Sequence, residues 1–248
     1  MIALALFMLG AIVASFVGVV VERVYTGQSW LSSRSRCDSC AKELSPLDLV
    51  PVFSWLLSLG TCRSCKARIS VMHVVWEVVL GSVFVLGYVA LGLSYPLLVY
   101  CLFVALLLFI VRYDLRHTIV PLIPSLVLVF LGGVYAYLGS ATLYEFGGAL
   151  LIAGGVSAFF FLMYLLSFGK AMGLGDTPVA LALALFSYPY AFSGLLFSFW
   201  IGAVIGIVLL LLSQGRPTMK REIPFVPFLA VGFLLAYFVA WNPFHLIL

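Results

Sequence analysis

Charged residues are scarce in this chain. Only 9% of its 248 residues are charged, whereas a soluble domain has about 25%. Hydrophobic residues make up 65% of the sequence, so too few polar side chains remain to cover a surface that faces water. The composition therefore excludes a soluble globular domain. It predicts an all-α membrane protein that crosses the bilayer several times.

Acidic residues are even rarer than basic ones. The nine Asp and Glu residues are outnumbered by thirteen Lys and Arg, which gives a formal net charge of +4. In a membrane protein the basic residues report on topology, so this excess calls for no nucleic-acid partner. The expected surroundings of the chain are the lipid bilayer.

Long apolar runs divide the chain into eight candidate transmembrane helices. They cover residues 1–21, 71–91, 95–111, 119–138, 146–166, 177–188, 191–212 and 224–241. The first run lacks a basic start and a small-residue cleavage site, so we interpret it as a retained helix and not as a signal peptide. Residues 22–70 form a polar insert between helices 1 and 2, and residues 71–248 form the main membrane domain.

The basic residues predict which loops face the cytoplasm. All thirteen fall in the odd-numbered loops: Arg23, Arg34, Arg36, Lys42, Arg63, Lys66, Arg68, Arg112, Arg116, Lys170, Arg216, Lys220 and Arg221. The positive-inside rule then places the odd loops in the cytoplasm and both termini outside. The sixth run is short, because twelve helical residues cover about 18 Å of a hydrocarbon core of about 30 Å.

Four cysteines in the insert form two Cys-x-x-Cys pairs, Cys37 with Cys40 and Cys62 with Cys65. Two such pairs can place four thiolates in the tetrahedron that zinc prefers. A cytoplasmic loop should keep its thiols reduced, which disfavours structural disulfides. The spacing predicts a zinc-ribbon-like insert with a structural Zn²⁺; unligated cysteines or a redox pair remain the alternatives. Four protein ligands leave no position for water, so the metal would perform no chemistry.

Two carboxylates border the membrane on the same side. Asp114 lies in FIVRYDLRHTIVP before the fourth helix, and Asp176 lies in MGLGDTP before the sixth. At similar depth, helix packing could bring them together, and two neighbouring carboxylates can share acid and base roles. Gly173 and Gly175 would let the backbone turn sharply and let an extended substrate approach.

Other roles for these acidic residues stay open at this point. Asp176 could be only a helix cap, and Asp114 could be a surface ion-pair residue between two arginines. The pair could also serve an ion-coupled transporter as a proton relay, or be replaceable in a zinc-stabilised scaffold. His73 and Glu77, four residues apart, are interpreted as a polar pair on the second helix.

Five short stretches resemble the bacterial type IV prepilin peptidases, in the same order along the chain. They are ASFVGVVVERV near the start, the cysteine insert with LDLVPVFSWL, YDLRHTIVP, MGLGD and IPFVPFLAVG. The resemblance implies a GxGD-type aspartyl endopeptidase with Asp114 and Asp176 as the catalytic pair. Pro178 stands where the family usually has a lysine.

The resemblance also implies a substrate, a location and a second activity. The enzyme would sit in the cytoplasmic membrane and remove the leader peptide of prepilins or pseudopilins at the cytoplasmic face. Many family members also methylate the new N-terminus with S-adenosylmethionine. For this chain the methyltransferase activity and its cofactor rest on the resemblance alone, because the sequence holds no glycine-rich Rossmann fingerprint.

Overall fold

A computed structural model describes residues 1–27, 29, 35–37, 39–170, 172–212 and 224–240. Four of the basic residues used for topology, Arg34, Arg216, Lys220 and Arg221, lie outside the described residues. In the described ranges the regular structure is helical, and the only extended pairings are two isolated bridges. The all-α prediction is therefore confirmed.

The helices follow the apolar runs closely. In chain order they are α1 (Ile2–Thr26), η1 (Pro46–Leu49), α2 (Phe53–Leu57), α3 (Val71–Leu91), α4 (Tyr95–His117), α5 (Leu122–Gly139), α6 (Leu143–Ser167), α7 (Asp176–Phe186), α8 (Ala191–Leu212) and α9 (Val226–Val239). Among the described residues six of them, α1, α3, α4, α5, α6 and α8, are long and apolar enough to cross a membrane. This is the composition of a multi-pass membrane protein.

Two apolar helices are too short to span a bilayer as straight segments. Helix α7 has 11 residues and α9 has 14, or about 16 Å and 21 Å of helix. Both belong to the second of two compact units into which the chain divides, Met1–Phe109 and Ile110–Leu248. Most of the side chains of α7 are buried, so its shortness reflects a place inside the protein.

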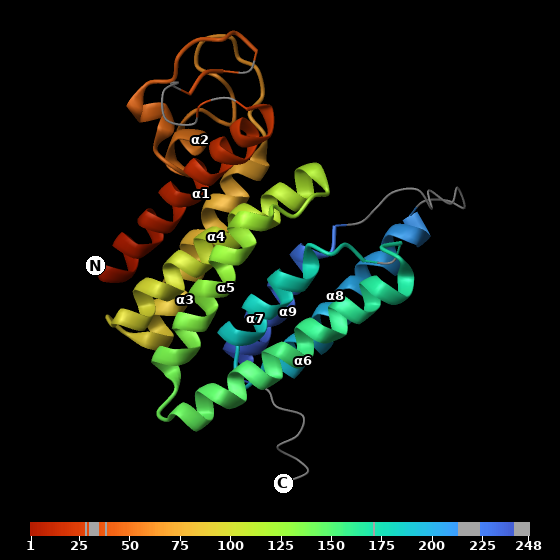
Figure 1. The fold of residues 1–248 in the computed structure, drawn as a ribbon. Helices are drawn as coiled ribbons and strands as arrows, with labels where there is room; N and C mark the ends of the chain where they lie inside the picture. Colours follow the sequence, from red (N-terminus) through yellow and green to blue (C-terminus); the bar gives the residue numbers. More distant parts are fainter. Residues whose placement is uncertain (28, 30–34, 38, 171, 213–223, 241–248) are drawn as a thin grey trace. The chain divides into compact units, whose positions relative to one another are not determined.

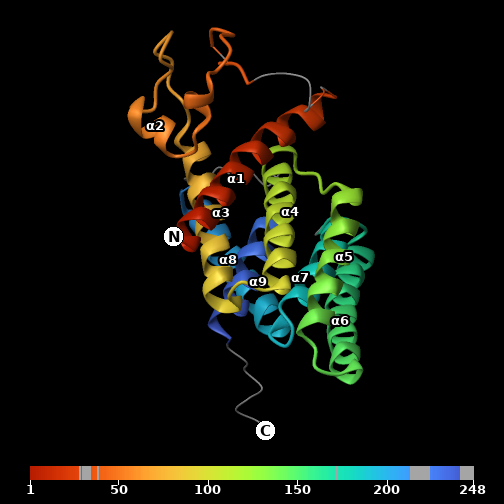
Figure 2. The same ribbon diagram turned by 90° about the vertical axis from the view of Figure 1, so that its left-hand side faces the viewer.

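Within the second unit, α7 is the central helix. It contacts α5, α6, α8 and α9, and both views show it among these neighbours (Figures 1 and 2). Its residues Val179, Ala180 and Leu183 have no exposed surface. Because its neighbours surround α7, they also hold its first residue, Asp176, in place.

Within the first unit, α1 and α3 pack through small residues. A Cβ atom added to Gly10 would lie 2.8 Å from Gly81 Cα, so the two backbones touch at this crossing. Such close approach through glycine is typical of membrane helix pairs. The buried ring of Tyr100 on α4 lies against Gly87, and its hydroxyl donates to the Val83 carbonyl at 3.0 Å.

A buried carboxylate attaches the insert to α3. Glu77 is 7% exposed, and it accepts a hydrogen bond of 2.7 Å from the backbone N–H of Val52. The predicted pairing of Glu77 with His73 is therefore wrong. His73 is exposed, although it lies one turn before the buried Glu77 on the same face of α3.

Glu77→Ala is expected to loosen the insert. The substitution leaves the Val52 N–H without its charged acceptor, at a cost of about 1.5–3 kcal/mol. Thermal unfolding and limited proteolysis between residues 27 and 70 measure the effect. His73→Ala is the matched control on the same helix face. An equal loss in both variants would support the pairing that we reject.

Candidate active site and metal centre

Asp114 lies near the end of α4, in the part of that helix that belongs to the second unit. It is 4% exposed, so the interpretation as a surface ion-pair residue is wrong. The backbone N–H of Val226, the first residue of α9, donates to its carboxylate. Its Oδ2 atom is buried and has no hydrogen-bond partner among the described residues. One carboxylate oxygen is thus anchored and the other is available.

Asp176 is the first residue of α7 and is 7% exposed. Gly175, which has no side chain, occupies the cap position, and Asp176 is the next residue. The sequence also fits Asp176 as a helix cap, but the helix begins one residue earlier than that role requires. The Asp176 N–H already donates to the Gly173 carbonyl at 3.2 Å. The Gly173 N–H in turn donates to the Asp176 carboxylate.

The fold places the two carboxyl groups close enough for their charges to interact. Asp114 and Asp176 interact electrostatically, although 61 residues separate them in the sequence, and both lie in the second unit. Asp176 is the first residue of α7, and Asp114, near the C-terminal end of α4, accepts a hydrogen bond from the first residue of α9. A helix N-terminus carries a partial positive charge that stabilises an anion. Each carboxylate thus lies beside the start of a short helix.

The two glycines before Asp176 differ in their surroundings. A Cβ atom on Gly175 would lie 2.6 Å from Val120 Cβ, so Gly175 allows α7 to approach the α4–α5 connection. A Cβ on Gly173 would meet nothing closer than Asp176 Oδ2 at 3.9 Å. Neither glycine has a positive φ. Gly175 is thus a packing residue, whereas the exposed Gly173 keeps an open side.

Gly175→Ala is expected to destabilise the second unit by about 1–3 kcal/mol, the usual cost of overpacking. The added methyl group must push Val120 or the start of α7 aside, which also displaces Asp176. Gly173→Ala is the matched control and should leave the melting temperature nearly unchanged. Adding Val120→Gly to Gly175→Ala should restore stability in part. Equal melting temperatures for the two alanine variants would contradict this packing.

The two cysteine pairs have the same local geometry. In each, the N–H of the first cysteine donates to the residue five positions on, Cys37 to Lys42 at 2.9 Å and Cys62 to Ala67 at 2.8 Å. Ala41 and Lys66, which follow the second cysteines, both have a positive φ, of 57° and 59°. This repetition of hydrogen bond and backbone turn brings the two sulfur atoms of each pair to one side of its loop.

The four sulfur atoms lie where a tetrahedral metal would place them. All four lie within 4.8 Å of one another, and Cys37 Sγ is 3.8 Å from Cys65 Sγ. Zinc–sulfur bonds of about 2.3 Å require sulfur separations of about 3.8 Å in a tetrahedron. Backbone N–H groups of Cys65 and Ser64 lower the pKa of the Cys62 thiol to about 6. The residues therefore fit a metal ion such as Zn²⁺.

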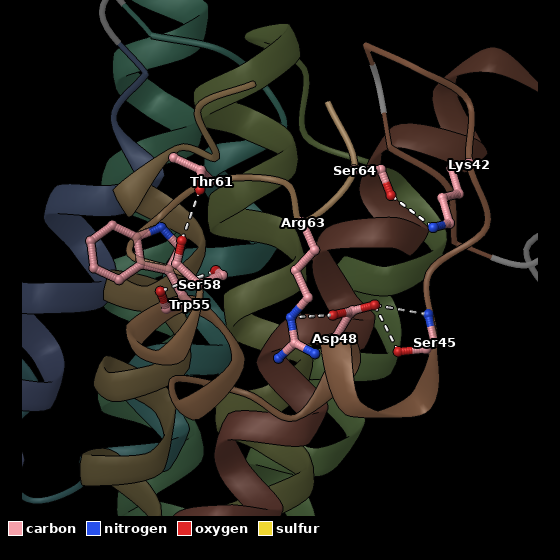
Figure 3. Close-up of polar contacts among 8 residues, drawn as sticks. All are labelled: Lys42, Ser45, Asp48, Trp55, Ser58, Thr61, Arg63 and Ser64. Atoms are coloured by element: carbon pink, nitrogen blue, oxygen red, sulfur yellow. Dashed lines mark hydrogen bonds and ion pairs between the residues drawn. The ribbon is translucent and has the colours of Figure 1, made fainter. Parts of the chain in front are cut away.

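Polar contacts tie the two cysteine loops together (Figure 3). Lys42 Nζ donates to Ser64 Oγ at 2.8 Å, and Arg63 Nε lies 3.2 Å from Asp48 Oδ1. The hydroxyl of Ser45, which donates to Asp48, holds the pKa of that carboxyl below its usual value. These contacts are exposed and individually weak, so the metal remains the main candidate for holding the insert together.

Sequence reasoning missed three parts of this site. They are the Val226 N–H that reaches Asp114, the packing of Val120 on Gly175, and the bond from Val52 to Glu77. Only the position of Val226 at a helix start could have been predicted from the local sequence. Pro227 follows Val226, and a proline in the first turn is typical of a helix start. The other two contacts join residues whose types carry no pattern.

Comparisons with known proteins relate this chain to bacterial prepilin peptidases. Residues 8–91 match the family model described as Bacterial Peptidase A24 N-terminal domain. A prepilin leader peptidase/N-methyltransferase of Bacillus subtilis is 29% identical over 94% of this chain and 92% of its own length. One of Myxococcus xanthus with the same name is 34% identical over 89% of this chain and 66% of its own length. No solved structure matches. The chain belongs to the bacterial type IV prepilin peptidase family.

Proposed function

We propose that this chain is a membrane-embedded aspartyl endopeptidase that removes the leader peptide of type IV prepilins or pseudopilins. The observation that carries the proposal is the meeting of Asp114 and Asp176, buried and interacting, in a chain of this family. Buried carboxylates at membrane depth are costly and are usually kept for function.

The two aspartates would divide acid and base catalysis between them. One carboxylate takes a proton from a water molecule as the water oxygen attacks the scissile carbonyl carbon. The other carboxyl group, protonated, donates to the carbonyl oxygen. A proton then passes to the amide nitrogen, the carbon–nitrogen bond breaks, and the products are a leader carboxylate and a new N-terminal amine. The free Oδ2 atom of Asp114 is the group positioned to hold the water.

The substrate would approach Asp176 along its open glycine. Gly173 and Leu174 are exposed, so an extended segment can lie beside the backbone there, while Gly175 supports the site through Val120. The distribution of basic residues supports a site at the cytoplasmic face of the membrane, with both termini outside. The family supports the inner membrane as its location. Hence we assign residues 71–248 to the protease domain and residues 22–70 to a loop folded by zinc on Cys37, Cys40, Cys62 and Cys65.

Methylation of the new N-terminus is a second proposal, supported by the names of the two relatives. A cavity of about 350 Å³ lies at the turn between α5 and α6, but its lining residues, 137–138 and 140–143, include no charged side chain for the amino and carboxylate groups of the cofactor. We therefore derive no step through S-adenosylmethionine.

Purified chain in detergent, incubated with a prepilin, tests the proposal. Mass spectrometry should detect the free leader and the shortened pilin, and added S-adenosylmethionine should raise the pilin mass by one methyl group. Detergent micelles hold no ion gradient, so a transporter would produce nothing under these conditions. An intact prepilin after incubation with folded protein would refute the peptidase.

A further inference from the structure

Three leucines of the cysteine insert (residues 22–70) are exposed, and no contact within the described part of the insert is shown for their side chains. Leu56, Leu57 and Leu59, the leucine patch, expose 54%, 77% and 86% of their surface. Leu59 also has a φ of 52°, a left-handed conformation that a leucine adopts at a steric cost. Glycine or asparagine would suit that backbone better. Several large apolar side chains exposed together are typical of a surface that contacts a membrane or another protein.

Two hydrogen bonds fix the leucine patch next to the start of α3. Trp55 Nε1 donates to the Ile69 carbonyl at 3.2 Å, and the Ile69 N–H donates to the Gly60 carbonyl at 2.8 Å. Trp55 and Gly60 flank the leucine patch on both sides in the sequence. Ile69 is two residues before the first residue of α3, and α2 lies beyond the N-terminal end of that helix (Figure 2).

The apolar surface continues from the patch onto a membrane-spanning helix. Ile69 is 40% exposed, and the outer side of α3 exposes a row of apolar residues: Val71, Met72, Val75, Val78 and Val79. Helix α3 is one of the six helices long and apolar enough to cross the bilayer, and we expect this exposed row to face hydrocarbon. The leucine patch extends that lipid-facing surface at the point where α3 leaves the membrane.

Basic side chains accompany the patch. Lys66 and Arg68, in the second cysteine loop just before Ile69, are both exposed. Apolar side chains flanked by Lys and Arg are the composition of segments that lie in the membrane interface, where anionic headgroups attract the cations.

We propose that the leucine patch inserts into the lipid interface beside α3, with Lys66 and Arg68 on anionic headgroups. The insert is then a domain that rests on the bilayer, and not one that projects freely into water. This follows from the continuity of exposed apolar surface and from the adjacent charge, and it does not depend on the proposed protease activity.

Site-specific photocrosslinking in the full chain tests the proposal. The photoreactive residue p-benzoylphenylalanine is placed at Leu57 or Leu59, and in a control at Glu43, an exposed polar position of the first cysteine loop. Each variant is reconstituted in nanodiscs of phosphatidylcholine with phosphatidylglycerol, irradiated and analysed by mass spectrometry. We expect on the order of tenfold more lipid adduct at positions 57 and 59 than at 43, because a side chain in the interface contacts acyl chains.

The adducts should also contain more phosphatidylglycerol than its share of the lipid, and Lys66→Gln with Arg68→Gln should remove that excess. A crosslink from position 57 or 59 to residues 110–240, or to added prepilin in place of lipid, would overturn the proposal. Equal lipid adduct at all three positions would overturn it as well. The melting temperature of each variant is compared with that of the wild type. Equal values show that a missing adduct does not result from misfolding.

Discussion

Asp114→Asn and Asp176→Asn are each expected to reduce prepilin cleavage by a factor on the order of 10³ or more. Asparagine has nearly the size of aspartate and keeps an oxygen for the N–H groups of Val226 and Gly173, so the fold should persist. What is lost is the exchange of a proton with water and substrate. The initial rate of leader release, measured by mass spectrometry, gives the effect.

The double variant distinguishes a catalytic pair from two independent residues. If the aspartates act as one unit, Asp114→Asn with Asp176→Asn should be scarcely slower than either single variant. Glu145→Gln is the control, because Glu145 belongs to the same unit but serves only the start of α6, where it accepts from the Ala141 N–H. Cleavage near the wild-type rate in either aspartate variant would exclude the dyad.

Removal of the metal is expected to unfold the cysteine insert. Binding of structural zinc contributes about 10–16 kcal/mol in small zinc domains, far more than the exposed contacts of Lys42 and Arg63 can replace. The purified chain should contain one zinc ion, and Cys62→Ser should lose it. A chelator should make residues 27–70 sensitive to protease while the membrane helices stay intact.

Cys101→Ala provides the matched control for the zinc prediction. Cys101 is the one cysteine outside the cluster, half-buried on α4, so its replacement should leave the zinc content unchanged. Native protein in which all five thiols react readily, with no metal released, would contradict a zinc site. A chelator without effect on proteolysis would show that the insert folds on other contacts.

Local sequence patterns predicted most of the fold. The eight apolar runs became eight helices, with ends that moved by up to six residues. The largest shift is at the end of α4, which continues from residue 111 to His117 and carries Asp114 into a helix. Apolar runs mark only the part of a helix that faces lipid or core. A hydropathy criterion therefore does not detect polar helix ends such as RYDLRH.

The candidate site was predicted in part. The residue types and spacings of the cysteines and the GxGD stretch singled out the residues that the structure gathers into two clusters. Contacts made by backbone groups were not predictable, because every residue has the same N–H. Val226 and Val52 became relevant only through their places beside Asp114 and Glu77.

By itself the sequence determined the class of the protein, the helices and the identity of the candidate metal-ligand and acidic side chains, because composition and short-range spacing act locally along the chain. The tertiary structure alone decided that α7 is enclosed by its neighbours and that Asp114 and Asp176 interact beside the starts of two short helices. It also decided that position 175 has no room for a side chain next to Val120. Those features depend on packing between segments that are far apart in the chain. In a closely packed protein, side chains must fill the available volume and buried polar groups must find hydrogen-bond partners in the same arrangement.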